Sequence, residues 1–418
     1  MRVIHLSHSD INGGAARAAY RIHHSLLNKS VNSNMWVNKA SSGDETITEP
    51  ISKVDKLINE IKPRLISYTL CKTLKSKNKV LHSPSVIPSK WVKLINNSNA
   101  DIVHLHWIQH EMLSIKDISK IKKPIVWTLH DMWGFCGAEH LTSDNRWREG
   151  YKKENRPTHE SGFDLNKWTW QRKRKYWKNP IQIVTPSNWQ TKCVKESKLM
   201  SDWPVSTIPN PINTNIWRPL DKKIAREQLN LSKEVPLILF GAIDGTKDYN
   251  KGFDLLISAL EHLKYDLNIK KAELVIFGES KPKSLPKLSL PVHYMGHLHD
   301  DLSIRILYSA ADVTLVPSRF EAFGQTASEA HACGTPVVSF DIGGLKDIIE
   351  HKKTGYLAKA FDIKDLAKGI SWVLENNKND KFNEAARDRA INKFREETIG
   401  DAYIKIYDKI LSRSKNND

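Results

Sequence analysis

Short apolar runs rich in β-branched residues alternate with longer helical segments along most of this chain of 418 residues. Such alternation is typical of βαβ units, in which a helix connects two parallel strands, so we predict an α/β fold with doubly wound sheets. The strands expected in the first half lie at residues 2–7, 34–38, 101–107, 124–131 and 181–187. Those expected in the second half lie at residues 235–243, 272–280, 292–298, 312–318 and 335–341.

A Pro- and Asn-rich stretch at residues 206–219 separates these two sets of strands and has the composition of a linker. The chain is too long for one ordinary core and suits two domains. We therefore expect doubly wound domains at residues 1–206 and 207–392 with a cleft between them. The last segment, residues 393–418, is expected to be helical and to return to the first domain.

Cysteine usage and hydropathy narrow the class of protein. No run approaches the ~18 apolar residues that a membrane span needs, and the start of the chain lacks the long apolar region of a secretory signal. The four cysteines (Cys71, Cys136, Cys193 and Cys333) are widely spaced and form no Cys/His cluster. This pattern argues against a zinc site or a disulfide framework, and it favours a cytoplasmic protein.

The formal net charge of +17 is concentrated in part at residues 151–178, where nine Lys/Arg face three Asp/Glu. Aromatic residues are interleaved with these charges, as on surfaces that contact a membrane interface or stack on bases. The equally weighted alternative is a solvated helix whose aromatic side chains pack inward. Nucleic acid, an anionic membrane and anionic small substrates therefore all remain open as partners.

Two glutamates, Glu321 and Glu329, flank a helix start in the stretch of residues 318–340. The backbone N–H groups and the dipole at such a start favour a phosphate, and Gly324 lets the backbone approach a ligand closely. A carboxylate within the helix could accept hydrogen bonds from ribose hydroxyls, and one in the loop could reach beyond the phosphates. A nucleotide-sugar needs all three of these groups: the helix start, the carboxylate within the helix and the carboxylate in the loop. The alternative is that both glutamates make structural hydrogen bonds while the small residues permit tight packing.

The segment "RFEAFGQTASEAHACGTPVV" resembles the E-x7-E element of retaining glycosyltransferases with the GT-B architecture, in particular glycosyltransferase family 4. The resemblance extends over nearly the whole chain through "GGAARAAYR", "TLHDMWGFCG", "IPNPIN", "NKGFDLL" and "GGLKDIIEHKKTGYLA". These segments are similar to the branch that builds bacterial exopolysaccharide, colanic-acid-like polymer or lipopolysaccharide O-chains. The resemblance implies a GT-B fold, with an acceptor-side domain at 1–206 and a nucleotide-sugar-binding domain at 207–392.

The resemblance also implies roles for the residues of the second domain. Glu329 would bind the ribose, Glu321 would face the transferred sugar and its phosphate, and Lys251 would bind phosphate. The backbone of Phe323, Gly324 and Gln325 would meet the diphosphate.

One position departs from the family pattern. The family often has an arginine where this chain has Ala242. Either Lys247 or another cation substitutes for it, or phosphate stabilisation depends more heavily on Lys251.

In the first domain, the resemblance places Gly13 and Gly14 near the donor phosphates and the transferred sugar, although two glycines there could simply form a tight turn. Arg17 is assigned to the acceptor side, with an ordinary surface arginine as the alternative.

His130 would lie nearest the transferred sugar and position it, although a histidine at a strand end is often a buried, hydrogen-bonded residue. Asp131 would orient His130 or the adjoining loop, and Trp133 is assigned to the acceptor side.

The mechanism implied is front-face retaining transfer, in which the leaving phosphate helps to deprotonate the incoming hydroxyl. The sequence shows no Asp-x-Asp motif at a strand end and no cluster of metal ligands, so we expect no metal and no resident cofactor. The expected partners are a UDP- or GDP-linked sugar, a glycan or lipid-linked oligosaccharide acceptor and an anionic membrane surface at the inner face of the plasma membrane. The alternatives are an epimerase-like GT-B enzyme and a basic nucleic-acid-binding protein.

Overall fold

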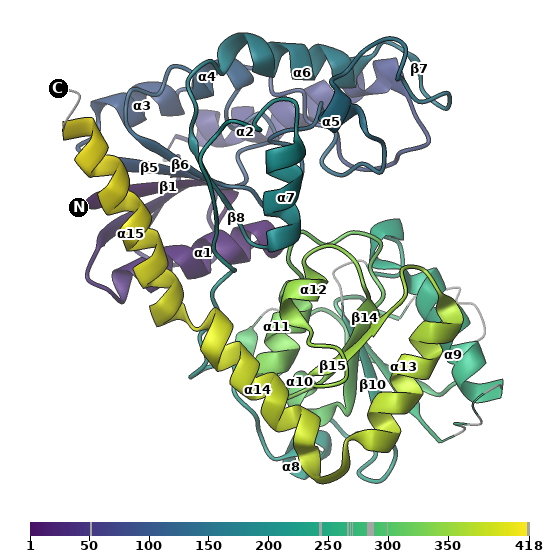
Figure 1. The fold of residues 1–418 in the computed structure, drawn as a ribbon. Coiled ribbons are helices and arrows are strands. Elements are labelled where there is room, and N and C mark those ends of the chain that lie inside the picture. The colour runs from purple at the N-terminus through teal and green to yellow at the C-terminus, as the bar shows by residue number, and fades with distance from the viewer. Residues whose placement is uncertain are drawn as a thin grey trace. The chain divides into compact units, whose positions relative to one another are not determined.

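The computed structural model describes residues 1–415 except 51, 242–244, 266, 268, 270, 282–287 and 299. The chain forms two compact units (Figure 1). The first comprises Met1–Pro209 together with the C-terminal residues from Ile399, and the second comprises Asn210–Thr398.

The first unit is built on a seven-stranded sheet in the order β3-β2-β1-β5-β6-β8-β9, with every neighbouring pair parallel. Its strands are β1 (Arg2–Ser9), β2 (Asn32–Lys39), β3 (Ile47–Thr48), β5 (Ile102–Leu105), β6 (Ile125–Thr128), β8 (Gln182–Thr185) and β9 (Val205–Thr207). Its helices are α1 (Gly14–Leu27), α2 (Lys53–Ile66), α3 (Trp91–Asn97), α4 (Ile115–Ile118), α5 (Arg146–Glu149), α6 (Leu165–Tyr176) and α7 (Asn188–Glu196), with a π-helical turn η1 (Ser67–Cys71) after α2 and a small ribbon of β4 (Leu74–Lys75) and β7 (Ser161–Gly162). All five expected strands are present. The short edge strands β3 and β9 were not expected.

The second unit is built on a six-stranded parallel sheet in the order β12-β11-β10-β13-β14-β15. Its strands are β10 (Leu237–Gly241), β11 (Glu273–Phe277), β12 (Val292–Tyr294), β13 (Val313–Val316), β14 (Val337–Phe340) and β15 (Gly355–Ala358). Its helices are α8 (Lys222–Gln228), α9 (Phe253–Tyr265), α10 (Asp301–Ala310), α11 (Gln325–Ala332), α12 (Leu345–Ile348), α13 (Ile363–Asn376) and α14 (Lys381–Phe394), with 3-10 turns η2 (Tyr249–Lys251) and η3 (Lys378–Asp380). The five expected strands are present, and β15 is an additional one.

Each sheet reverses its strand order once. The reversal lies between β1 and β5 in the first unit and between β10 and β13 in the second. Open α/β sheets bind ligands outside the carboxyl ends of the strands at this point. The loops after β1, β5, β10 and β13 are therefore the places where a site is expected.

The C-terminal helix α15 (Glu396–Lys415) packs on the first unit from Ile399 onward (Figure 1). Tyr403 and Tyr407 are fully buried in a cluster with apolar residues of β1, α1, β5, β6 and β8. The Tyr407 hydroxyl lies 2.7 Å from Nδ1 of His104, and the Tyr403 hydroxyl lies 3.1 Å from Oγ1 of Thr128. Hydrophobic burial and hydrogen bonds thus both hold the end of the chain on the first sheet.

The basic and aromatic segment at residues 151–178 takes mainly the inward-packing form. Trp170, Trp177 and Lys173 on or beside α6 are buried. The Arg172 guanidinium donates to the backbone carbonyls of Pro84 and Ser85 at 2.6 and 2.9 Å. Part of this segment, including two of its tryptophans, therefore belongs to the core of the first unit.

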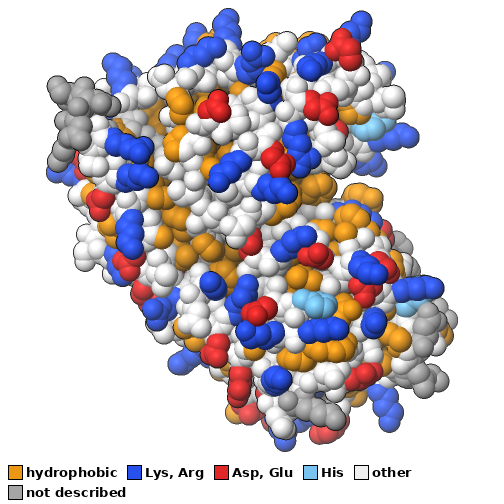
Figure 2. All heavy atoms as spheres, viewed as in Figure 1, with side chains coloured by type: hydrophobic (Ala, Val, Ile, Leu, Met, Phe, Trp, Pro, Cys, Tyr) orange, Lys and Arg blue, Asp and Glu red, His pale blue; other side chains and the backbone are white. Residues whose placement is uncertain are grey.

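Lys and Arg side chains are scattered over the visible face of both units and do not gather in one patch there (Figure 2). Among the described residues, no helix is both long enough and apolar enough to cross a bilayer.

Candidate active site

The segment that joins β13 to α11 turns sharply at Gly324. Its φ of +108° is rarely adopted by residues with a side chain, and a β-carbon there would lie 2.7 Å from Cδ2 of Leu345. Gly324 has no side chain with which to cap α11, so the helix start presents backbone amides and the positive end of the dipole. The Phe323 ring packs inward against Phe394, with 5.5 Å between ring centroids, so only the backbone of Phe323 can meet a ligand.

Two glycines that carried no role in the sequence reasoning hold this loop in place. A β-carbon on Gly343 would lie 2.3 Å from the Glu321 carbonyl oxygen, and one on Gly344 would lie 2.4 Å from that of Ala322. The Gly344 N–H donates to the Glu321 carbonyl at 2.8 Å. The signal was available in the segment "GGLKDIIEHKKTGYLA", which was part of the family resemblance but was given no role.

Lys251 and Glu321 form an ion pair in the second unit. Nζ of Lys251 lies 2.9 Å from Oε1 of Glu321, which also accepts from the Ser318 hydroxyl at 3.0 Å. The Glu321 carboxylate raises the pKa of Lys251, so the lysine is charged at neutral pH. A phosphate that reaches Lys251 would therefore meet a cation already held in place by a carboxylate.

The turn that carries Lys251 docks directly on the end of β13. The Asn250 side chain donates to the Phe320 carbonyl at 3.0 Å, and Arg319 N–H donates to the Asn250 carbonyl at 2.7 Å. Gly252 takes a φ of +70°, and a β-carbon there would lie 2.1 Å from the Pro317 carbonyl oxygen. The pairing of Lys251 with Glu321, 70 residues away, thus follows from backbone contacts on both sides.

Glu329 lies in α11 and is 7% exposed. Its Oε2 lies 3.4 Å from the Tyr308 hydroxyl of α10. Glutamate side chains are rarely so buried. Because Glu329 lies one turn into α11, its carboxylate is close to the start of the helix.

The two lysines considered as phosphate-binding cations have different surroundings. Ala242 lies outside the described residues. Lys247 has a side chain that is 72% exposed, and its Nζ lies 3.6 Å from Oε1 of Glu279. Of Lys247 and Lys251, Lys251 is the one that pairs with Glu321.

In the first unit, Gly13 precedes α1 with a φ of +92°. A β-carbon on Gly13 or Gly14 would meet no described atom within 4 Å, so the start of α1 borders open space. Arg17 lies in the first turn of α1 and is partly buried.

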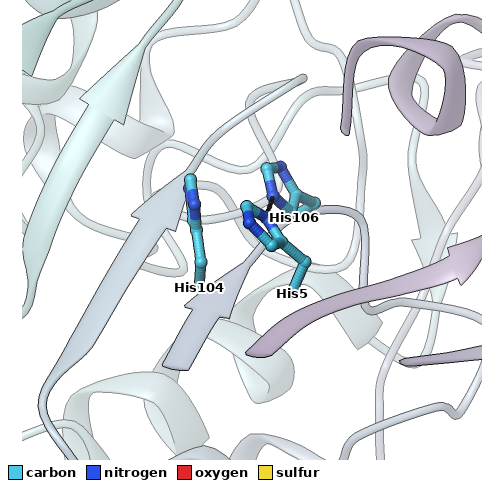
Figure 3. A group of neighbouring side chains, drawn as sticks. All are labelled: His5, His104 and His106. Carbon is cyan, nitrogen blue, oxygen red and sulfur yellow. Dashed lines mark hydrogen bonds between the residues drawn. The ribbon is translucent and has the colours of Figure 1, made fainter. Parts of the chain in front are cut away.

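His130 follows β6 and is the outer member of a row of three histidines. Its Nε2 lies 3.2 Å from Nδ1 of His106, and Nε2 of His106 lies 2.9 Å from Nδ1 of His5 (the second contact is drawn in Figure 3). Burial lowers the pKa of His130 to about 4 and that of the other two well below the usual value. All three rings are therefore neutral at pH 7, and each carries one N–H.

The inner end of the row determines its tautomers. Nε2 of His5 is buried and has no partner among the described residues. A buried N–H without an acceptor costs more free energy than a buried ring nitrogen that accepts no hydrogen bond. We therefore assign the His5 proton to Nδ1. His5 then donates to His106, His106 donates to Nε2 of His130, and His130 keeps its own proton on Nδ1. This tautomer makes His130 a hydrogen-bond donor through Nδ1.

His5, His104 and His106 form the one group of three or more potential metal ligands among the described residues, with ring nitrogens within 4.8 Å of one another (Figure 3). The sequence reasoning expected no such cluster, because about a hundred residues separate His5 from the other two. His104 lies 2.7 Å from Thr128 Oγ1 through Nε2 and 2.7 Å from the Tyr407 hydroxyl through Nδ1. With the His5–His106 and His106–His130 contacts, hydrogen bonds engage every ring nitrogen of the group except Nε2 of His5. The group thus fits a hydrogen-bond network better than a ligand set.

Asp131 orients the loop after β6. Its carboxylate accepts from His140 Nδ1 at 2.6 Å, from Trp107 Nε1 at 3.0 Å and from the Trp133 N–H at 2.9 Å. Burial opposes its ionisation, but His140 and these hydrogen bonds outweigh burial and hold the pKa of Asp131 below its usual value. Of the two partners expected for Asp131, the adjoining loop is the one to which it is hydrogen-bonded.

Lys173 supports the same loop from inside the unit. Its ammonium group donates to the backbone carbonyls of Trp133, Cys136 and Gly137 and lies 3.8 Å from the centroid of the Trp133 ring. Burial lowers the pKa of Lys173 to about 7. The Trp133 ring is fully buried, so it packs beneath the loop and does not face an acceptor.

Two family models match this chain. The model described as Glycosyltransferase Family 4 matches residues 12–216, and the one described as Glycosyl transferases group 1 matches residues 221–389.

Curated relatives match over different lengths. A D-inositol 3-phosphate glycosyltransferase of Xylanimonas cellulosilytica is 38% identical over 147 residues, which are 33% of each chain. The chain thus spans about a third of that relative's length, and it spans about two fifths of the next curated relatives it matches. An uncharacterized 41.2 kDa protein in the cps region of Klebsiella pneumoniae is 24% identical over 330 residues, which cover 76% of this chain and 81% of that one.

Solved structures resemble the whole chain. Sucrose-phosphate synthase from Thermosynechococcus elongatus has a TM-score of 0.67 at 18% identity and covers 99% of this chain and 100% of its own. Anabaena HepE in complex with UDP and glucose has a TM-score of 0.63 at 15% identity and covers 98% and 100%. WaaG, described as a glycosyltransferase involved in lipopolysaccharide biosynthesis, has a TM-score of 0.63 at 15% identity and covers 98% and 99%. At these identities the likeness concerns the fold.

Proposed function

This chain belongs to glycosyltransferase family 4 and has the predicted α/β GT-B fold, and we propose that it is a retaining, hexosyltransferase-type enzyme. It moves a sugar from a UDP- or GDP-linked donor to a growing, lipid-linked cell-surface polysaccharide. The donor lies at the carboxyl end of the second sheet and the acceptor lies against the first unit.

The observation that carries this proposal is the start of α11, with Lys251 paired to Glu321 on one side and Glu329 buried behind it. A diphosphate would be bound by the helix amides and Lys251. The Glu329 carboxylate would accept from ribose hydroxyls, and Glu321 would face the sugar. Structures of HepE with UDP and with UDP-glucose support a nucleotide-sugar as the ligand of this fold.

The chemistry proposed is a front-face displacement. The bond between the anomeric carbon and the donor phosphate oxygen breaks, while the acceptor hydroxyl forms a bond to that carbon on the same face. The hydroxyl proton goes to the leaving phosphate, whose charge Lys251 and the helix amides stabilise. Through its Nδ1–H, His130 donates to the transferred sugar and positions it. No step of this route uses a metal ion.

The acceptor class is supported by likeness in fold and sequence. WaaG is described as acting in lipopolysaccharide biosynthesis, and the Klebsiella relative is encoded in a cps region. On this proposal the enzyme works in the cytoplasm at the inner face of the plasma membrane, where a lipid-linked acceptor is presented.

The test is donor hydrolysis with a panel of UDP- and GDP-sugars. We expect Glu329→Ala and Lys251→Ala each to lower hydrolysis of the preferred donor at least tenfold, because each removes a contact to the charged part of the donor. Lys247→Ala is the matched control, since its ammonium group pairs with Glu279. Wild-type rates in both site variants would contradict the site.

A thermal-shift comparison separates the competing functions. Stabilisation by UDP or GDP supports the proposal. Stabilisation by an oligonucleotide but by no nucleoside diphosphate would instead favour a nucleic-acid-binding protein. Release of an epimerised sugar from the donor without an acceptor would favour an epimerase-like enzyme.

A further inference from the structure

Helix α2 carries a row of large apolar side chains that face solvent. Val54, Leu57, Ile61, Leu65 and Tyr68 follow one another at intervals of three or four residues through α2 into η1. This spacing places them on one face of a helix. Their exposed fractions are 63, 57, 48, 53 and 71%. Apolar faces of this kind mark interaction sites.

The side of α2 that faces the body of the first unit is mainly polar. Asp55 accepts from Lys90 at 2.6 Å, Asn59 donates to Asn38 at 3.2 Å, and Lys62 donates to the Pro88 carbonyl at 3.4 Å. Within Lys53–Ile66, which the structure describes in full, Ile66 is the one buried residue. The usual arrangement of a surface helix is therefore inverted, with its apolar side chains on the solvent side.

Cations surround this apolar face. Between Lys53 and Lys79 the chain has eight Lys/Arg and two Asp/Glu. Lys53, Arg64 and Lys72 are exposed beside the row, and Nζ of Lys72 lies 3.8 Å from the centroid of the Tyr68 ring. An apolar row with a basic border matches the surface of a bilayer that contains anionic lipid.

A pocket of about 420 Å³ opens beside the end of this helix. Its lining includes Tyr68, Cys71, Leu81, His110 and Glu111. His110 and Glu111 adopt φ values of +54° and +58°, and Glu111 anchors them by accepting from two backbone N–H groups at 2.7 Å. Strained backbone of this kind is often found at ligand sites.

The inner side of the pocket lies near the loop after β6. The His110 ring packs edge to face on Trp107, with 4.7 Å between centroids. Trp107 in turn donates to Asp131 at 3.0 Å. The pocket therefore joins the exposed face of α2 to the strand ends of the first unit.

We propose that the face of α2 and η1 formed by Val54, Leu57, Ile61, Leu65 and Tyr68 lies on an anionic bilayer, and that the adjacent pocket receives the apolar part of a membrane lipid. The role of that lipid as an acceptor rests on the proposed function. Binding of the face to the bilayer does not.

The test is co-sedimentation with vesicles of phosphatidylglycerol and phosphatidylcholine, at low and at high salt. We expect the wild-type protein to bind, to bind more weakly at high salt, and to lose at least tenfold in affinity in the Leu57→Glu/Ile61→Glu variant. The control is Ile224→Glu/Leu302→Glu, which adds the same charge at positions of similar exposure, 57 and 59%. This control should bind like the wild type. Circular dichroism would establish that both variants are folded.

Three outcomes would overturn the proposal. They are absence of vesicle binding by the wild type, equal binding by the Leu57→Glu/Ile61→Glu variant, and a dimer in sedimentation velocity that this variant abolishes. Donor hydrolysis without vesicles should be unchanged in this variant. If the wild type hydrolyses no donor, the proposed function fails while the vesicle result still decides the role of α2.

Discussion

At the scale of single residues, His106 is the least obvious member of the candidate site. It lies between His5 and His130 and contacts both through its two ring nitrogens. It touches no proposed substrate, so we regard it as a positioning residue that keeps the His130 proton on Nδ1.

We expect His106→Phe to lower donor turnover about fivefold while leaving the KM for the donor nearly unchanged, because the loss of one hydrogen bond costs about 1 kcal/mol. The specific readout is the tautomer of His130, measured from its 15N chemical shifts, which should change from one form to a mixture. His104→Phe is the control, since His104 bonds to Thr128 and Tyr407 and not to His130. An unchanged His130 tautomer in His106→Phe would contradict the assignment.

Sequence reasoning located individual residues better than their contacts. The spacing of Glu321 and Glu329 around Gly324 led directly to a helix start with a positive φ glycine. The ion pair of Lys251 with Glu321 joins residues 70 apart, and the contact of His5 with His106 joins residues 101 apart. Such contacts depend on the order of strands in a sheet, and the local pattern of apolar and polar residues does not specify that order.

At the scale of elements, α6 shows why composition left two interpretations of residues 151–178 open. Its positive charges do not all face solvent, because Lys173 is fully buried and donates to three backbone carbonyls. The helix thus holds the loop after β6, which also carries Asp131.

We expect Lys173→Met to lower the free energy of unfolding by about 3 kcal/mol or more, because it leaves buried carbonyls without donors. Lys175→Met on the exposed side of α6 is the matched control and should change stability by less than about 0.5 kcal/mol. Urea denaturation followed by circular dichroism measures both. Equal stability of the two variants would mean that Lys173 is not needed for the loop.

The regular elements were predictable where the sequence is strongly periodic. Every expected strand is present, since buried parallel strands read as continuous apolar runs. The edge strands β3 and β9 were missed because they contain two and three residues. Helix α2 was missed because its apolar residues face outward and its segment is rich in lysine.

At the scale of the whole molecule, buried titratable groups are divided unevenly between the units. Burial lowers the pKa of eight histidines of the first unit: His5, His8, His23, His82, His104, His106, His110 and His130. In the second unit His331 shares this strong shift, to about 3. The first unit should therefore be the more sensitive to acid.

The direction of this pH effect on stability follows from the number of protons that the folded and unfolded states bind. A histidine whose pKa falls from 6.5 to about 4 on folding, such as His23, binds fewer protons in the folded state than in the unfolded state between these values. The contribution of such a histidine to the free energy of unfolding is thus fully present above about pH 6.5 and is lost as the pH falls towards 4. At pH 5 the loss is roughly 2 kcal/mol for one such group. Burial raises the pKa of Glu139 to about 7 and also raises the pKa values of Glu111 and Glu160, which acts in the opposite direction, but these are three groups against eight histidines.

Tryptophan fluorescence can follow the first unit almost alone, because all of the 13 tryptophans except Trp217 and Trp372 lie there. We expect the midpoint of thermal unfolding detected by tryptophan to fall by roughly 10 °C or more between pH 7.5 and pH 5. His23→Gln, which keeps hydrogen-bonding groups near Ser33 and Thr46 but cannot titrate, should reduce this shift. A midpoint independent of pH over this range would show that the buried histidines do not govern the acid stability of the unit that carries them.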